Sequence, residues 1–246
     1  MNQYAKNFYR PELDEMKNRF SMLTKNHHAL QAWKDFVVLG ACNISPLKQS
    51  EYSPEFINLT GRYTTDELMI MMEMLEITTA ALSTYPEYDF LGEFYTYIDS
   101  TNRSYRNKRN PSLYAKTSVS VNHLREDLVN SAWLKITDEA CGTGSTIIQI
   151  LNDCRSEHLN YQSTLFFVAK DHNRSAALAC YLQLSLLGCA GCVIAPDGLG
   201  LHSPVDNLGT DAHEGYEIWI MPMTYTGDWQ WRFMVDQSCK TLKLKK

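Results

Sequence analysis

The sequence has no long run of apolar residues. No stretch approaches the ~20 apolar residues that a membrane-spanning helix requires, and the first residues, Met1 to Lys6, lack the apolar centre of a secretory signal peptide. We therefore predict a soluble, cytoplasmic protein without a membrane partner. A chain of 246 residues can bury a full core, either as one large domain or as one domain with a helical extension.

Cysteine is present but does not form the pattern of a disulfide framework. The seven cysteines are an odd number scattered through apolar or helical contexts, which predicts reduced thiols. Cys189 and Cys192 form a single Cys-x-x-C pair, whereas a zinc site needs a second pair of ligands at a usable spacing. Because small residues surround the pair, we interpret it as tight packing before a strand and predict no metal site.

The chain also has no surplus of positive charge. Its formal net charge is -5, and affinity for nucleic acid comes largely from cations placed against phosphates, so any contact with DNA has to be local. One segment, Asn102 to Lys116, interleaves cations with tyrosine rings, which suits a nucleic-acid strand. A solvated basic linker explains the same composition equally well. The candidate DNA-contacting residues are Arg103, Arg106, Lys108, Arg109 and Tyr114.

The pattern of the chain changes near residue 115. We predict an N-terminal helical region over residues 1–114 and a second region over residues 115–246. In the first, residues 29–42 place apolar side chains on one face of a helix. A second helix is predicted after Thr64, which forms a capping-box pattern with Glu67 before a methionine-rich run. We expect these helices to pack on each other, with the methionines filling the core.

In the second region, short apolar strands alternate with helices, which is the order of an α/β fold. The predicted strands cover residues 132–137, 163–171, 191–197 and 216–221. A helix that is apolar nearly all round, residues 174–187, joins the second strand to the third. The first three strands end at Asp138, Asp171 and Asp197. We expect these acids to lie along one edge of a parallel sheet, where open α/β folds bind ligands.

The most informative stretch runs from Asp138 to Gly144 and joins the first strand to a helix-like segment. Glycines at such a bend let the backbone approach a ligand, and the acid can hold a cationic or hydroxyl-bearing group. A phosphate-binding loop would place lysine where Ser145 stands. A dinucleotide fingerprint needs three glycines, and its pyrophosphate would be repelled by an aspartate. An ordinary strand-to-helix turn with two glycines is the remaining alternative.

The ligand that these features favour is S-adenosylmethionine. Its amino-acid portion, ribose hydroxyls and adenine amino group are hydrogen-bond donors, so its site must supply acceptors such as carboxylates. Each aspartate taken alone is also typical of a turn or a helix cap. Three aspartates in the same position after successive strands weaken that alternative.

The chain resembles the N6-adenine DNA methyltransferases of the type I restriction-modification kind, and more closely their short versions from phages and mobile elements. Residues 138–144 are similar to the family's first motif, Asp-Pro-Ala-Cys-Gly-Thr-Gly, with Glu139 in place of proline. Residues 167–171 and the helix after them resemble the second motif, and residues 197–199 resemble the third. Residues 88–93 resemble the segment that joins the family's helical region to its catalytic domain.

The resemblance implies a Rossmann-like methyltransferase fold with an N-terminal helical region and S-adenosylmethionine as cofactor. The implied cofactor-binding residues are Asp138, Ala140, Cys141, Gly142, Thr143, Gly144, Asp171, His172 and Asp197. The implied activity is methylation of adenine N6 in DNA, with the target base flipped out of the helix. Because few residues follow the fourth strand, target recognition is expected from a protein partner or from the basic segment.

One departure from the family concerns catalysis. The family's catalytic tetrad, Asn-Pro-Pro followed by an aromatic residue, should follow the fourth strand, where this chain has Met-Pro-Met-Thr-Tyr. In the family the asparagine accepts hydrogen bonds from the target amine and the ring stacks on the base. The corresponding candidate catalytic residues are Met221, Pro222 and Tyr225. Methionine accepts hydrogen bonds only weakly, whereas the tyrosine ring can still stack.

Two hypotheses of function follow. The first is an adenine-N6 DNA methyltransferase. The second is a catalytically degenerate protein of a phage or mobile element, which binds S-adenosylmethionine or a partner and acts by interaction, for example by interfering with restriction-modification. Methylation of a small molecule or a protein by the same fold also stays open.

Overall fold

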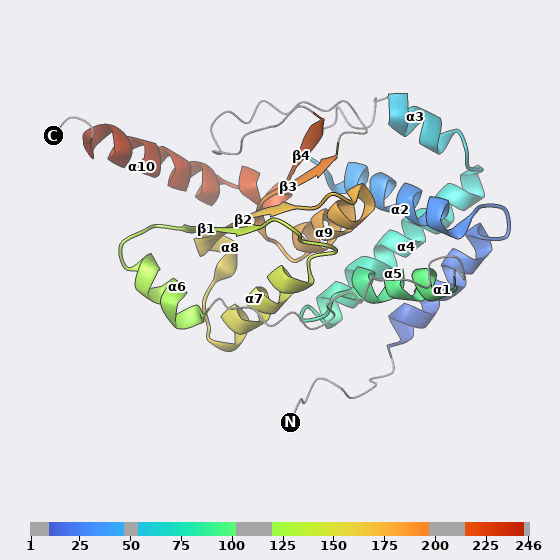
Figure 1. Cartoon of the computed structure of the whole chain (residues 1–246), viewed down its shortest axis with the longest axis horizontal. Coiled ribbons are helices and arrows are strands. Elements are labelled where there is room, and N and C mark those ends of the chain that lie inside the picture. The colour runs from blue at the N-terminus through green and yellow to red at the C-terminus, as the bar shows by residue number, and fades with distance from the viewer. Residues whose placement is uncertain (1–9, 47–53, 102–119, 197–214, 244–246) are drawn as a thin grey trace.

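The computed structural model describes residues 10–46, 54–101, 120–196 and 215–243, in which a four-stranded sheet lies beside a group of helices (Figure 1). The strands are β1 (Leu134–Asp138), β2 (Leu165–Lys170), β3 (Ala190–Pro196) and β4 (Tyr216–Ile220). The helices are α1 (Pro11–Leu23), α2 (Ala29–Ile44), α3 (Pro54–Thr60), α4 (Thr65–Thr84), α5 (Phe90–Thr101), α6 (Val121–Leu128), α7 (Ser145–Ser156), α8 (Tyr161–Thr164), α9 (Arg174–Leu186), the 3-10 turn η4 (Pro222–Tyr225) and α10 (Gly227–Lys243).

The sheet has the order β1-β2-β3-β4 and is mixed. The first three strands are parallel, with Asp138 beside Ala169 and Lys170 beside Ile194. β4 runs antiparallel to β3 and pairs Tyr216 with Pro196. The α/β class and the four predicted strands are confirmed, with bounds shifted by one or two residues. The direction of β4 places its first residue, not its last, at the edge where β1, β2 and β3 end.

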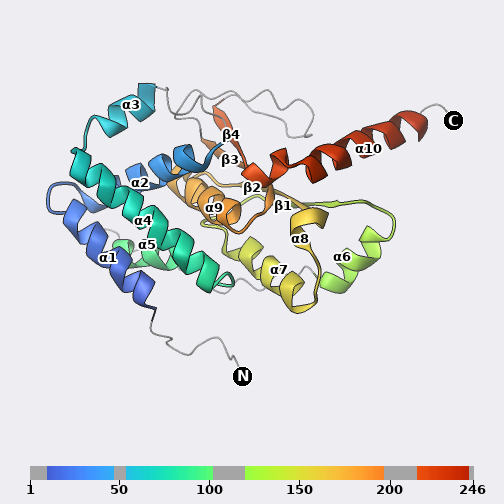
Figure 2. The ribbon, with the colours of Figure 1, turned by 180° about the vertical axis from the view of Figure 1, so that it is seen from behind.

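The two faces of the sheet are covered by different helices. The α7 and α9 helices lie on one face, where Phe167 of β2 joins the main core of the molecule. On the other face Phe166 packs against Trp229 of α10, with ring centroids 5.5 Å apart. The rest of α10 extends beyond the sheet, as both Figure 1 and Figure 2 show. Residues of β2 are therefore apolar on both faces, which is why this strand reads as a continuous hydrophobic run.

The helical region packs against the sheet domain through α2 and α9. Gly40 of α2 lies against Leu182 of α9, so closely that a Cβ atom there would lie 3.1 Å from the leucine methyl groups. Trp33 of α2 belongs to the same core as Tyr181 of α9. Core residues thus come from both sides of the division predicted near residue 115, and the two regions bury one continuous set of apolar side chains.

The methionine-rich helix α4 begins as the sequence predicts. Thr64 caps it, because its hydroxyl accepts the Glu67 backbone N–H at 3.3 Å while the Thr64 backbone N–H donates to the Glu67 carboxylate at 2.9 Å. The expectation that its methionines fill the core is only half right. Met71 and Met74 are buried, but Met69 and Met72 are exposed, because only one face of the helix packs on neighbouring helices.

Two kinds of feature are absent from the parts of the chain that the structure describes. Within them, no helix combines the length and the apolar character that crossing a bilayer requires. No three histidine, cysteine or acidic side chains of the described ranges gather as a metal site would need.

Cys189 and Cys192 are buried at the start of β3, and burial raises the pKa of both thiols, that of Cys192 to about 12. Both are therefore neutral thiols at pH 7.

Candidate functional site

The glycine turn, residues 139–144, connects β1 to α7 at the edge of the sheet where the parallel strands end (Figure 1). Gly142 and Gly144 have φ angles of 54° and 103°, in the left-handed region that only glycine adopts freely. Among the residues that the structure describes, a Cβ atom on Gly142 would meet nothing within 4 Å. The backbone at Gly142 is therefore open to an approaching ligand, whereas Gly144 is enclosed by α9.

Asp138 and Asp171 flank this turn, as predicted from their positions after neighbouring parallel strands. Asp171 Oδ2 accepts the Gly142 backbone N–H at 2.8 Å, and its Oδ1 accepts the Asn173 N–H at 2.7 Å. Asp138 Oδ1 accepts the Ala140 N–H at 3.1 Å. The other oxygen, Asp138 Oδ2, is buried and has no hydrogen-bond partner among the described residues. An unpaired buried acceptor is unfavourable, so this oxygen marks a place for a donor.

The remaining predicted cofactor-binding residues lie in different environments. Ala140 is exposed and Cys141 is buried, with its backbone N–H donating to the carbonyl of Lys170 at 2.9 Å. Thr143 donates its hydroxyl to Asp89, which precedes α5, at 2.7 Å. His172 is exposed and directly follows Asp171. The predicted residues that lie outside the described residues are Asp197, Arg103, Arg106, Lys108, Arg109 and Tyr114.

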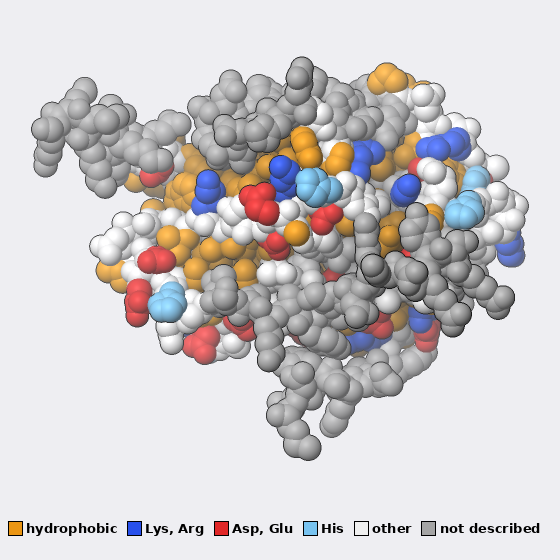
Figure 3. Space-filling view, in the orientation of Figure 1, with side chains coloured by type: hydrophobic (Ala, Val, Ile, Leu, Met, Phe, Trp, Pro, Cys, Tyr) orange, Lys and Arg blue, Asp and Glu red, His pale blue; other side chains and the backbone are white. Residues whose placement is uncertain are grey.

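In a polar group at the same edge, the sequence indicated His172 but not the residues around it. The Tyr216 hydroxyl lies 3.3 Å from His172 Nδ1, and Lys170 Nζ lies 4.7 Å from the centre of the Tyr216 ring. Beside them, Arg174 Nε donates to the buried Glu217 carboxylate at 2.8 Å. Acidic, basic and histidine side chains lie close together over the sheet on the face drawn in Figure 3. Only the antiparallel direction of β4 brings Tyr216 and Glu217 here, and alternation along a strand does not reveal its direction.

The structure does not bring the candidate catalytic residues Met221, Pro222 and Tyr225 to this site. The Met221 N–H donates to the Gly191 carbonyl at 2.9 Å, and the buried Thr224 hydroxyl accepts the Gly191 N–H at 2.8 Å. This segment therefore closes the start of β3, at the opposite edge of the sheet from the glycine turn. Five or six strand residues at ~3.3 Å each separate the two edges by roughly 15–20 Å. The three residues do follow the fourth strand, and because β4 is antiparallel they lie away from the glycine turn; their catalytic role stays a prediction.

The chemistry of the edge is that of a hydrogen-bond acceptor site. Asp138 and Asp171 supply carboxylates, and the open backbone at Gly142 gives access to them. A hydrogen bond with the Cys141 thiol and burial raise the pKa of Cys180, so the Cys180 thiol is neutral at pH 7. Comparisons with protein-family models, with curated proteins and with solved structures found no match for this chain.

A separate cavity of about 410 Å³ lies in the helical region. Residues of α2, α3 and α4 line it, including Phe36, Phe56 and Met71, and nearly all of this lining is apolar. None of the lining residues belongs to the glycine turn or to the strands. The cavity therefore does not contribute to the acceptor site at the sheet edge.

Proposed function

We propose that this chain binds S-adenosylmethionine at the edge formed by the glycine turn, Asp138 and Asp171. The observation that carries the proposal is the buried Asp138 Oδ2, which has no partner among the described residues. The cofactor's ammonium and ribose hydroxyls are donors that match such an acceptor. When bound, the cofactor supplies a sulfonium methyl group.

The topology supports a Rossmann-like site. The spatial order β3-β2-β1, with α7 and α9 on one face, is the order of one half of a doubly wound sheet. In such sheets ligands bind beyond the carboxyl ends of the strands. Asp138 and Gly142 lie at the carboxyl end of β1, which is an outer strand of the described sheet because β4 pairs with β3. Asp171, after the neighbouring strand, offers a second carboxylate for hydroxyl groups of the ligand.

The placement of Met221 and Tyr225 favours the catalytically degenerate form of this function. Transfer of a methyl group to an adenine amine requires acceptors for the amine protons close to the sulfonium. The segment after β4, which aligns with the family's tetrad, instead bonds to Gly191 at the other edge of the sheet. We therefore propose that the protein acts by interaction with a partner, DNA or protein, while holding the cofactor.

Calorimetry with S-adenosylmethionine tests the binding claim. We expect binding by the wild-type protein and a loss of at least about tenfold in affinity for Asp138→Ala and for Asp171→Ala. Asp127→Ala, on the exposed side of α6, is the matched control and should bind as the wild type does. Absence of binding by the folded wild-type protein would overturn the proposal.

A methyl-transfer assay separates the two hypotheses. The protein is incubated with unmethylated bacterial and phage DNA and with cofactor carrying a labelled methyl group. We expect cofactor binding without incorporation of label into DNA. Incorporation that disappears in Asp138→Ala would instead establish an active DNA methyltransferase and reject the degenerate form.

A further inference from the structure

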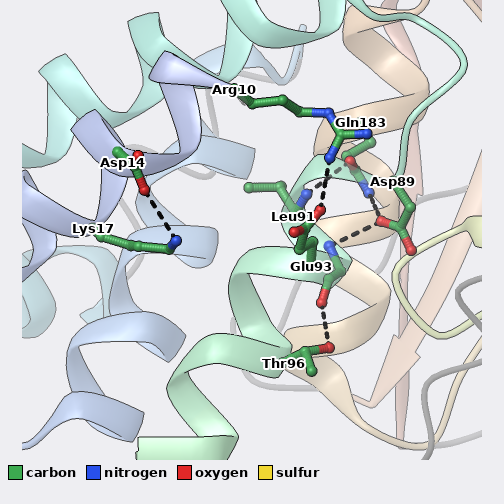
Figure 4. Close-up of polar contacts among 9 residues, drawn as sticks. Arg10, Asp14, Lys17, Asp89, Leu91, Glu93, Thr96 and Gln183 are labelled. Atoms are coloured by element: carbon green, nitrogen blue, oxygen red, sulfur yellow. Dashed lines mark hydrogen bonds and ion pairs between the residues drawn. The ribbon is translucent and has the colours of Figure 1, made fainter. Parts of the chain in front are cut away.

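A buried carboxylate links the helical region to the glycine turn. Asp89 lies immediately before α5, is 7% exposed and accepts three hydrogen bonds from three parts of the chain. The donors are the Gly92 backbone N–H at 2.9 Å, the Gln183 side-chain amide at 2.7 Å and the Thr143 hydroxyl at 2.7 Å. Figure 4 shows Asp89 and Gln183 pointing toward each other between α5 and α9.

Gln183 of α9 completes the link. Its side chain is fully buried, and its Oε1 accepts the Leu91 backbone N–H at 3.0 Å. Its Nε2 donates both to Asp89 and to the Thr143 backbone carbonyl, the latter at 2.8 Å. Both the hydroxyl and the carbonyl of Thr143 are therefore held by this pair of side chains. Thr143 thus bonds the glycine turn to Asp89, immediately before α5, and to Gln183 of α9.

The Asp89 carboxylate restricts which residue can stand three positions after it. A Cβ atom on Gly92 would lie 2.2 Å from the Asp89 carboxylate, so glycine is required three residues after the aspartate. Desolvation by burial raises the pKa of Asp89, whereas the hydrogen bonds from Gln183, Thr143 and Gly92 act to lower it. A helix cap for α5 explains the bond from Gly92 alone. The other two donors belong to α9 and to the glycine turn.

We infer that Asp89 is a positioning residue, which reaches from the helical region through Thr143 and holds the glycine turn in the conformation that binds the cofactor. This inference rests on the proposed function of the turn. It makes the helical region a necessary part of the cofactor site. A partner that displaces the start of α5 would change cofactor affinity without touching the cofactor.

The first test removes the Thr143 hydroxyl at constant shape. Thr143→Val is compared with Thr78→Val, a buried threonine of α4 whose hydroxyl bonds only within its own helix, to the Met74 carbonyl at 2.8 Å. Two quantities are measured: affinity for S-adenosylmethionine by calorimetry, and hydrogen exchange of the peptide covering residues 139–144 in the free protein. We expect Thr143→Val to lose about tenfold in affinity and to exchange faster at the turn, with Thr78→Val unchanged in both.

The second test uses rescue by a conservative variant. In Asp89→Asn the remaining oxygen can accept the Gly92 and Gln183 bonds, and the new amide can donate to the Thr143 hydroxyl. We expect Asp89→Asn to keep cofactor affinity within about threefold, and Asp89→Ala to lose at least about tenfold. Asp35→Ala is the matched control, because Asp35 is a buried acid of α2 bonded to Tyr63 and Arg62. It should lower thermal stability and leave affinity unchanged.

The results distinguish this inference from the proposed function. If the wild type binds cofactor but Thr143→Val and Asp89→Ala bind it equally well, the positioning role is rejected and the function stands. It is also rejected if Thr78→Val or Asp35→Ala weakens binding as much. If the wild type binds no cofactor, the proposed function is rejected. Hydrogen exchange of residues 139–144 then decides whether Asp89 holds the glycine turn. If exchange at residues 139–144 is faster in Thr143→Val but not in Thr78→Val, the link between Asp89 and the glycine turn is supported. Equal exchange in the two valine variants rejects this link.

Discussion

The sulfur of Cys180 in α9 packs against Gly144 of the glycine turn. A Cβ atom on Gly144 would lie 3.1 Å from this sulfur, whereas the same atom on Gly142 would meet no described residue within 4 Å. Both glycines have positive φ angles. Gly142, at 54°, lies in the left-handed region that other residues can enter at a cost, whereas Gly144, at 103°, lies beyond it, so a substitution at Gly144 meets both more backbone strain and a packing conflict.

We predict that Gly144→Ala destabilises the protein more than Gly142→Ala does. A left-handed conformation costs alanine ~1–2 kcal/mol at Gly142. At Gly144 the φ angle is less favourable still for alanine, and the contact with Cys180 adds ~1–3 kcal/mol of overpacking. The free energy of unfolding in urea measures both variants. Equal losses would show that α9 moves away from the turn at little cost.

A fully buried tryptophan of α10 packs on the second face of the sheet. Trp229 is fully buried, its ring lies 5.5 Å from that of Phe166, and its Nε1 donates to the Gln162 carbonyl at 2.8 Å. We predict a loss of ~3–5 kcal/mol for Trp229→Ala. Trp231, two residues later and 64% exposed, is the matched control. Trp231→Ala should change the free energy of unfolding by less than ~0.5 kcal/mol, and a comparable loss in both would contradict this view of α10.

The cap of α4 predicts a dependence of stability on pH. Hydrogen bonds from the Thr64 backbone and from Asn26, with further bonds from His27, lower the pKa of Glu67 from 4.5 to about 2. A lowered pKa means that the folded state favours the carboxylate. The stabilisation is therefore complete above pH 4.5 and is lost as the pH falls toward 2.

Glu67→Gln isolates this effect. We expect the melting temperature of the wild type to exceed that of Glu67→Gln at neutral pH and the difference to shrink between pH 4.5 and 2. Thermal unfolding followed by circular dichroism over this range is the measurement. Glu76→Gln, at an exposed position of the same helix, should show no such change. A constant difference between wild type and Glu67→Gln at every pH would contradict the prediction.

The features that the sequence predicted correctly are local. The bond between Thr64 and Glu67 joins residues three apart, so its pattern is visible in the sequence. Asp138 ends β1 and Asp171 directly follows β2, so both lie at the same end of a parallel pair, and a strand-helix-strand order favours parallel pairing. In both cases the repeat of a helix or the order of the elements fixes where the residues lie.

The features that the sequence did not predict depend on distant contacts. Thr143 and Asp89 are 54 residues apart, and nothing near either one indicates the other. β4 runs antiparallel to β3, and after the strand ends Thr224 bonds to Gly191 at the start of β3. These contacts join residues that are distant in the sequence. An alternating strand pattern is the same for both directions. The sequence alone therefore does not show at which end of the sheet the residues after β4 lie.

The position of Tyr225 away from the glycine turn can be tested directly. This residue is 43% exposed and lies on η4, which closes the start of β3, so it does not face the glycine turn. We predict that Tyr225→Ala keeps affinity for S-adenosylmethionine within about twofold of the wild type, while Asp138→Ala loses at least about tenfold. Calorimetry on both variants, with matched melting temperatures, is the measurement. If Tyr225→Ala weakened binding as much as Asp138→Ala, the prediction would be contradicted. Residues at the start of β3 would then contribute to cofactor binding together with those at the glycine turn.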